Sequence, residues 1–112
     1  MKTIYLSGPM TGIPEKNRPL FAKWANTLRA LGYNVISPPE MDQDPDTGYD
    51  DNYYKLLKHA IQQMLTADFV ITLPGWKSSK GASLEVDLAN KVQIPVYDIK
   101  DLAQFLNGGE LL

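Results

Sequence analysis

The chain of 112 residues contains no cysteine and a single histidine, His59. The lack of cysteine excludes disulfide bonds, a thiolate nucleophile and any zinc site built on sulfur. A single histidine excludes a metal site made of several imidazoles, and a Ser-His-Asp triad would have to use His59. The chemistry that remains is that of carboxylates, hydroxyls and backbone amides acting on a small molecule, with no metal.

Long apolar runs and an excess of positive charge are also missing. No stretch approaches the roughly 20 apolar residues that span a bilayer, and the first residues lack the apolar core of a secretory signal. We therefore expect a cytoplasmic protein with no membrane partner. The net charge of −2 and the pI near 5.2 argue against a nucleic-acid partner, because binding to a duplex depends on many Lys and Arg contacts to phosphates.

The composition is that of an ordinary globular chain, with 44% hydrophobic and 21% charged residues. Its length predicts one domain spanning residues 1–112. A domain of this size buries enough surface to fold without a metal or a disulfide.

Strand and helix patterns alternate along the chain. β-prone runs lie at 3–6, 34–37, 69–73 and 95–99, and helical spacing lies at 19–31, 53–65, 79–92 and 102–106. Such alternation implies parallel strands joined by right-handed crossovers. We predict an α/β fold of the flavodoxin or Rossmann-like type, which is an open parallel sheet of strand order 2-1-3-4 with helices on both faces.

A ligand crevice is expected beyond the carboxyl ends of the strands, where the strand order reverses. Here that point lies between the first and third strands, so the loops at 7–12 and 74–81 should face each other. The first loop is rich in glycine but lacks the dinucleotide and phosphate-loop patterns. Either its amides cradle an anionic or sugar group, or it is a turn that merely needs glycine.

Glu85 occupies an unusual place on its helix. Steps of about 100° per residue put the apolar side chains on one arc, with Glu85 at its centre. An ionised carboxylate there is costly unless it is hydrogen-bonded or opens to a cavity. Its place near the expected crevice favours a pocket; the alternative is a structural carboxylate bonded to backbone amides or to Tyr5. The apolar arc consists of Ala82, Leu84, Val86, Leu88, Ala89 and Val92.

Three segments carry a family resemblance: Ile4-Tyr5-Leu6-Ser7-Gly8-Pro9, Ala67-Asp68-Phe69-Val70-Ile71, and Ser79-Lys80-Gly81-Ala82-Ser83-Leu84-Glu85 followed by Ala89. With them the chain resembles the nucleoside 2-deoxyribosyltransferase superfamily, including its nucleotide N-glycosidase branch. Within it, Leu73-Pro74-Gly75-Trp76 together with Ser79, Gly81-Ala82 and Glu85 is similar to an uncharacterised bacterial and phage group. The resemblance covers nearly the whole chain in order.

The resemblance implies an enzyme in which Glu85 is the nucleophile and Tyr5 helps to position it. Glu85 would attack the anomeric carbon of a deoxyribosyl group and form an ester, which water or a second base then releases. The implied partner is a small molecule, a 2′-deoxynucleoside or its 5′-monophosphate, and no cofactor is implied. The substrate-binding residues implied are Ser7, Gly8, Pro9, Met10, Trp76, Ser79 and Gly81.

Ser79 stands six residues before Glu85, where the resemblance distinguishes two branches. Nucleoside transferases carry Asp there, whereas monophosphate glycosidases carry Ser. A hydroxyl at a helix N-terminus, with Lys77 and Lys80 nearby, suits a phosphate. Trp76 either stacks on the base or anchors its loop. The resemblance further implies a homo-oligomer, a dimer or larger, in which a neighbouring subunit completes each site.

One position departs from the resemblance. The family carries an Asp that assists protonation of the leaving base, and here Ala60 stands in its place. The neighbouring His59 is expected on the wrong side of the helix, pointing into solvent. General acid assistance is worth about 10²- to 10⁴-fold. The chain is therefore a slow enzyme, uses another acid, or is a catalytically silent nucleotide-binding module.

Overall fold

The computed structural model describes residues 2–41 and 53–102. The elements are β1 (Thr3–Ser7), η1 (Pro14–Asn17), α1 (Arg18–Ala30), β2 (Asn34–Ile36), α2 (Pro38–Met41), α3 (Tyr53–Met64), β3 (Phe69–Thr72), η3 (Trp76–Ser78), α4 (Lys80–Lys91) and β4 (Val96–Asp98). Residues 99–102 are helical, so the predicted last helix begins earlier than expected, and its residues 103–106 lie outside the described part. No helix in the described part combines the length and the apolar character needed to cross a membrane.

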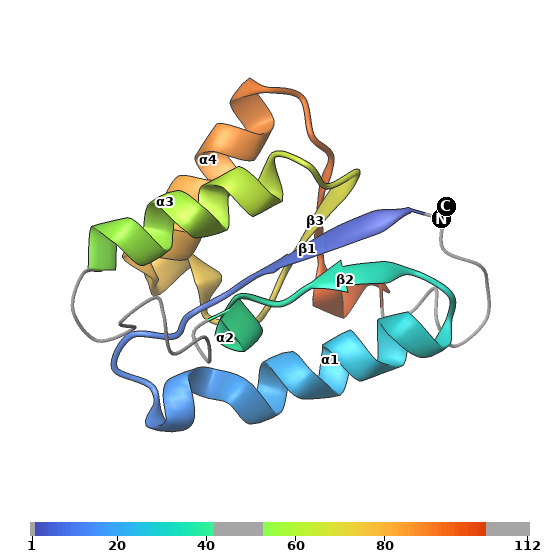
Figure 1. Ribbon diagram of the computed structural model, residues 1–112, viewed down its shortest axis with the longest axis horizontal. Helices are drawn as coiled ribbons and strands as arrows, with labels where there is room; N and C mark the ends of the chain where they lie inside the picture. The colour runs from blue at the N-terminus through green and yellow to red at the C-terminus, as the bar shows by residue number, and fades with distance from the viewer. Residues whose placement is uncertain (1, 42–52, 103–112) are drawn as a thin grey trace.

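The four strands form one parallel sheet in the order β2-β1-β3-β4. Helix α1 lies along one face of the sheet, and helices α3 and α4 lie over the opposite face (Figure 1). The predicted fold class and strand order are confirmed. Because β1 is paired on both sides, its backbone is fixed within the sheet and its side chains have fixed positions on the two faces.

Successive side chains of β1 point to opposite faces of the sheet, as in any strand. Ile4 and Leu6 join the core beneath α1, whereas Tyr5 joins the core beneath α3 and α4. Ser7 shares the face of Tyr5 because it lies two residues further along the strand. The α1 core also contains Phe21, Ala25, Leu28, Ile71, Leu73, Ile99 and Leu102, and the other core contains Ala60, Met64, Val70 and Ala89.

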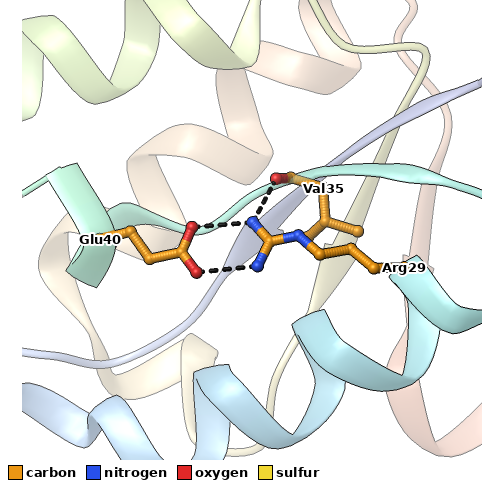
Figure 2. A network of polar contacts seen from close by, with 3 residues as sticks. All are labelled: Arg29, Val35 and Glu40. Carbon is orange, nitrogen blue, oxygen red and sulfur yellow. Dashed lines mark hydrogen bonds and ion pairs between the residues drawn. The ribbon is translucent and has the colours of Figure 1, made fainter.

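An ion pair at the edge of the sheet joins α1, α2 and β2 (Figure 2). The guanidinium of Arg29 donates two hydrogen bonds to Glu40, of 2.9 and 2.8 Å, and one of 2.8 Å to the carbonyl oxygen of Val35. The short helix α2 is not among the predicted elements, since the second predicted strand ends at residue 37 and the next predicted helix begins at 53. Proline is tolerated in the first turn of a helix, where its missing N–H has no partner to lose.

Two exposed side chains, one on α4 and one directly after it, correct the predicted apolar arc. Leu84 and Val92 were placed on the apolar arc, but they are 45% and 47% exposed. The buried stripe of α4 is narrower and follows the spacing i, i+3, i+4 and i+7, with Glu85 inside it. That stripe consists of Ala82, Glu85, Val86 and Ala89.

Candidate active site

Glu85 is placed by a helix that begins with a side-chain cap. The hydroxyl oxygen of Ser79 accepts a hydrogen bond of 3.2 Å from the backbone N–H of Ala82, which fixes the first turn of α4. In the second turn of the helix, Glu85 faces the sheet and is only 5% exposed. The cap and the buried stripe together aim its carboxylate at β1.

Two neutral hydroxyls of β1 hold the carboxylate. Tyr5 donates a hydrogen bond of 2.6 Å to Oε2 of Glu85, and Ser7 donates one of 2.9 Å to Oε1. In the described residues no cation forms an ion pair with Glu85. Burial raises the pKa of Glu85, and the hydrogen bonds from Tyr5 and Ser7 oppose that rise without cancelling it.

A cavity of about 360 Å³ opens above this carboxylate. Tyr5 and Glu85 form part of its wall, and the loop after β1, Pro38 of α2, helix α3 and the first turn of α4 form the rest. Its volume lies within the range of about 300–1,000 Å³ that is usual for small-molecule sites. The buried carboxylate is therefore in contact with a space that can admit a ligand.

Most of the predicted site residues meet at this cavity. Ser7 holds Glu85 but does not line the cavity, and Pro9 and Trp76 do not line it either. The carbonyl oxygen of Pro9 accepts a hydrogen bond of 3.0 Å from the side chain of Asn17, and the ammonium of Lys77 lies 5.9 Å from the centroid of the Trp76 ring. The predicted residues that do line the cavity are Tyr5, Gly8, Met10, Ser79, Gly81 and Glu85.

Gly8 is required where it stands. A Cβ at this position would lie 2.9 Å from the Cβ of Leu73 and 3.4 Å from the Phe21 ring. The first turn after β1 therefore packs directly on the end of β3, and at the same time Gly8 lines the cavity. The close contact explains why the loop needs glycine at this position, and the alternative that the amides of the loop cradle an anionic or sugar group stays a prediction.

The sequence did not predict that helix α3 forms a wall of the cavity, nor that His59 and Lys16 line the cavity. Helix α3 provides that wall, whereas the loop at 74–81 contributes only through Ser79 and Gly81. His59 is exposed, as expected, but it lines the cavity beside Ala60, so its predicted position on the wrong side of the helix is corrected. Lys16 also lines the cavity, while Lys77 and Lys80 do not.

The error over His59 has a geometric cause. The helical arithmetic measures the angle from the buried core, but the cavity lies at the edge of that core. The sequence did not predict the position of Lys16 either. Glu15, Lys16 and Asn17 adopt positive φ angles of 56°, 54° and 64°, which are uncommon for residues other than glycine. No three His, Asp or Glu side chains within residues 2–41 and 53–102 gather as a metal site.

The chain belongs to a family described as a domain of unknown function, DUF4406, whose model matches residues 2–98. Among solved structures it is similar to the 2-deoxyribosyltransferase from the psychrotolerant bacterium Bacillus psychrosaccharolyticus. That similarity has a TM-score of 0.68 and 22% identity, and it covers 86% of this chain and 70% of the other. At this identity the likeness establishes the fold. No curated protein matches the chain significantly.

Proposed function

We propose that this protein cleaves the N-glycosidic bond of a 2′-deoxynucleoside or its 5′-monophosphate, with Glu85 as the nucleophile. The observation that carries the proposal is a carboxylate that is 5% exposed, has no cationic partner in the described residues, and lines a cavity of about 360 Å³. Perturbed carboxylates in cavities are typical of catalytic sites. The fold shared with a 2-deoxyribosyltransferase supports the same class of reaction.

In the first step an oxygen of Glu85 bonds to the anomeric carbon as the bond from that carbon to the base nitrogen breaks. The electron pair of the broken bond leaves with the base, and the sugar remains as an ester of Glu85. Water or a second base then attacks the anomeric carbon and frees the carboxylate. Hydrolysis and transfer differ only in this acceptor.

The environment of Glu85 suits this role. Burial raises its pKa, so the ionised form is more basic than a solvated carboxylate. The hydroxyls of Tyr5 and Ser7 favour the ionised form and orient both oxygens. Because both hydroxyls come from the central strand, the nucleophile is held by a rigid element.

The cavity wall has one apolar part and one polar part. Met10 and Leu56 offer apolar surface to a base, while Ser79 and Gly81 lie at the N-terminus of α4, which favours a hydroxyl or a phosphate. The cation nearest such a phosphate is expected to be Lys16, which lines the cavity. We further propose that the protein is a single domain, forms a homo-oligomer and is located in the cytoplasm.

A second candidate function is a catalytically silent nucleotide-binding module. Ala60 favours it, because this residue lines the cavity with a methyl group where a proton donor is expected from the family resemblance. Such a module would bind the same ligands and leave the glycosidic bond intact.

The decisive experiment measures free base by chromatography from a panel of 2′-deoxynucleosides and their monophosphates. The wild-type protein should release base, and Glu85→Gln should lower the rate by at least about 10³-fold, because an amide cannot form the sugar ester. Calorimetry should find ligand binding retained in Glu85→Gln. The matched control is Asp87→Asn, an exposed carboxylate on the same helix that pairs with Lys91.

Two results would overturn the enzyme. One is a wild-type protein that binds a nucleotide but releases no base during hours at high protein concentration, which is the result expected of the binding module. The other is a Glu85→Gln variant that keeps the wild-type rate.

A further inference from the structure

Helix α3 turns one continuous arc of side chains toward the cavity. Leu56, Leu57, His59 and Ala60 all line it, and at about 100° per residue they span an arc of about 160°. His59 lies at one edge of this arc. Its side chain is exposed and lines the cavity, so the imidazole lies where the cavity meets solvent.

Two other hydroxyls of the cavity wall already take part in hydrogen bonds. The hydroxyl of Tyr5 donates to Glu85, and the hydroxyl oxygen of Ser79 accepts the capping bond of α4. Lys16 brings a positive charge and Thr11 a hydroxyl. An imidazole, unlike either of these, both gives and takes a proton readily near neutral pH.

We propose that His59 is the general acid that protonates the leaving base. The inference rests on the proposed function, since it assigns a second catalytic group to the same cavity. It assigns the proton transfer to α3 and the nucleophile to α4. The two groups therefore belong to different walls of the cavity, as a reaction between a nucleophile and a departing base requires.

In the first step, proton transfer from His59 accompanies the departure of the base. An oxygen of Glu85 bonds to the anomeric carbon, the bond from that carbon to the base nitrogen breaks, and its electron pair stays on the base. The imidazolium of His59 gives its proton to a ring nitrogen of that base and becomes neutral. The neutral base diffuses away through the open side of the cavity, where His59 is exposed.

The second step returns the proton. Water enters the space that the base has left, and the neutral imidazole takes a proton from it as its oxygen bonds to the anomeric carbon. The ester bond breaks, the electron pair returns to Glu85, and His59 is again an imidazolium. The exposure of His59 is useful here, because the group must exchange protons with the incoming water.

The test compares two leaving groups. A natural 2′-deoxynucleoside releases a base that needs a proton, whereas 4-nitrophenyl 2-deoxyriboside releases 4-nitrophenolate, an anion that is stable without one. In His59→Asn, the first turnover, which precedes hydrolysis of the ester, should release base about 10²- to 10⁴-fold more slowly, whereas the first-turnover burst of nitrophenolate should stay within about threefold of wild type. Gln62→Asn is the control, because Gln62 is exposed on the same helix and does not line the cavity.

Each outcome decides the question. A His59→Asn variant that slows both substrates equally would show that His59 binds the sugar or supports the wall, and one that slows neither would show that it has no role; either overturns the inference alone. A wild-type protein that cleaves neither substrate overturns the proposed function, and this inference with it. Thermal melts of the variants should match wild type, since His59 is exposed.

Discussion

Glu40 and Glu85 are the same residue type in two opposite environments. The side chain of Glu40 is 51% exposed and accepts two hydrogen bonds from the guanidinium of Arg29. Its pKa is lowered, chiefly by the hydrogen bond from Arg29. Glu85 is almost fully buried, its hydrogen bonds come from neutral hydroxyls, and burial raises its pKa.

The difference separates a carboxylate that stabilises the fold from one that does not. An ionised Glu40 attracts a full positive charge in water and contributes weakly to stability. An ionised Glu85 lacks that attraction and has given up its hydration, so folding would favour an uncharged side chain there. Buried carboxylates without a cationic partner are typical of functional sites rather than of stabilising ion pairs.

Among changes at the two carboxylates, a large effect on activity is expected when one of the two hydroxyls that hold Glu85 is removed. Tyr5→Phe should lower base release by about 10- to 100-fold, because losing a hydrogen bond to a charged group costs about 1.5–3 kcal/mol. The pKa of Glu85 should rise further, since Tyr5 lowers it, so the acid side of the pH–rate profile should move to higher pH. The measurement is the pH dependence of base release.

Tyr97→Phe is the matched control for Tyr5→Phe. Tyr97 lies on β4, packs edge-on against Phe69 and is absent from the cavity wall. An unchanged rate and pH profile in Tyr5→Phe would contradict the role assigned to the 2.6 Å hydrogen bond.

The next expected effect is a gain in the stability of Glu85→Gln over wild type at high pH. Because the pKa of Glu85 is higher in the folded than in the unfolded protein, its contribution is fully present below the unfolded pKa, about 4.5, and is lost as pH rises through the folded pKa. The amide of Glu85→Gln does not ionise, so raising the pH removes no stability from the variant at this position. Thermal melts should place the variant near wild type at acidic pH and above it at pH 8, where each 1 kcal/mol of difference would shift the melting temperature of a domain of this size by about 4 °C.

A Glu85→Gln variant that melts several degrees below wild type at pH 8 would instead mark a structural carboxylate. The same experiment thus chooses between the two explanations that the sequence left open for Glu85.

The smallest effect is expected at the other carboxylate. Glu40→Gln should lower the free energy of unfolding by less than about 1 kcal/mol at neutral pH, because the pair is exposed and salt screens it. The pKa of Glu40 is lower in the folded protein, so its contribution is present above the unfolded pKa and is lost as pH falls through the folded pKa. The stability lost in Glu40→Gln relative to wild type should therefore vanish in acid. At high pH the two variants differ from wild type in opposite directions, because Glu85→Gln is expected to be the more stable protein there.

Base release by Glu40→Gln should equal that of wild type, since Glu40 is absent from the cavity wall. A large loss of activity would mean that α2, which Glu40 connects to Arg29, controls the cavity through Pro38.

Local patterns predicted the sheet and singled out the buried carboxylate of Glu85. The alternation of strands and helices gives the strand order through general rules of chain connection, and the helical spacing singled out Glu85 because a charge interrupted an apolar stripe. Tyr5 could be named as its partner only as an alternative or through resemblance. Its hydrogen bond depends on the packing of α4 over β1, which periodicity does not encode.

The wall formed by α3 was beyond the sequence for the same reason. Whether His59 faces solvent or a cavity depends on how far α3 is displaced from α4, and no spacing within α3 reports that distance. The left-handed backbone at Lys16 is likewise unsupported by any local pattern, since none of the residues at 15–17 is a glycine. Cavity edges are made by tertiary packing, so they were the least predictable part of the site.

Because the side chains of β1 alternate between the two faces of the sheet, the pairing of this strand decides which residues can reach Glu85. A slip of one residue in the pairing of β1 would turn Tyr5 and Ser7 into the core beneath α1 and would point Ile4 and Leu6 at Glu85. The hydroxyl pair is therefore tied to the register of the central strand. Variation in ligand preference among related chains should accumulate in α3 and the loop after β1, while the carboxylate and its two hydroxyls change together or not at all.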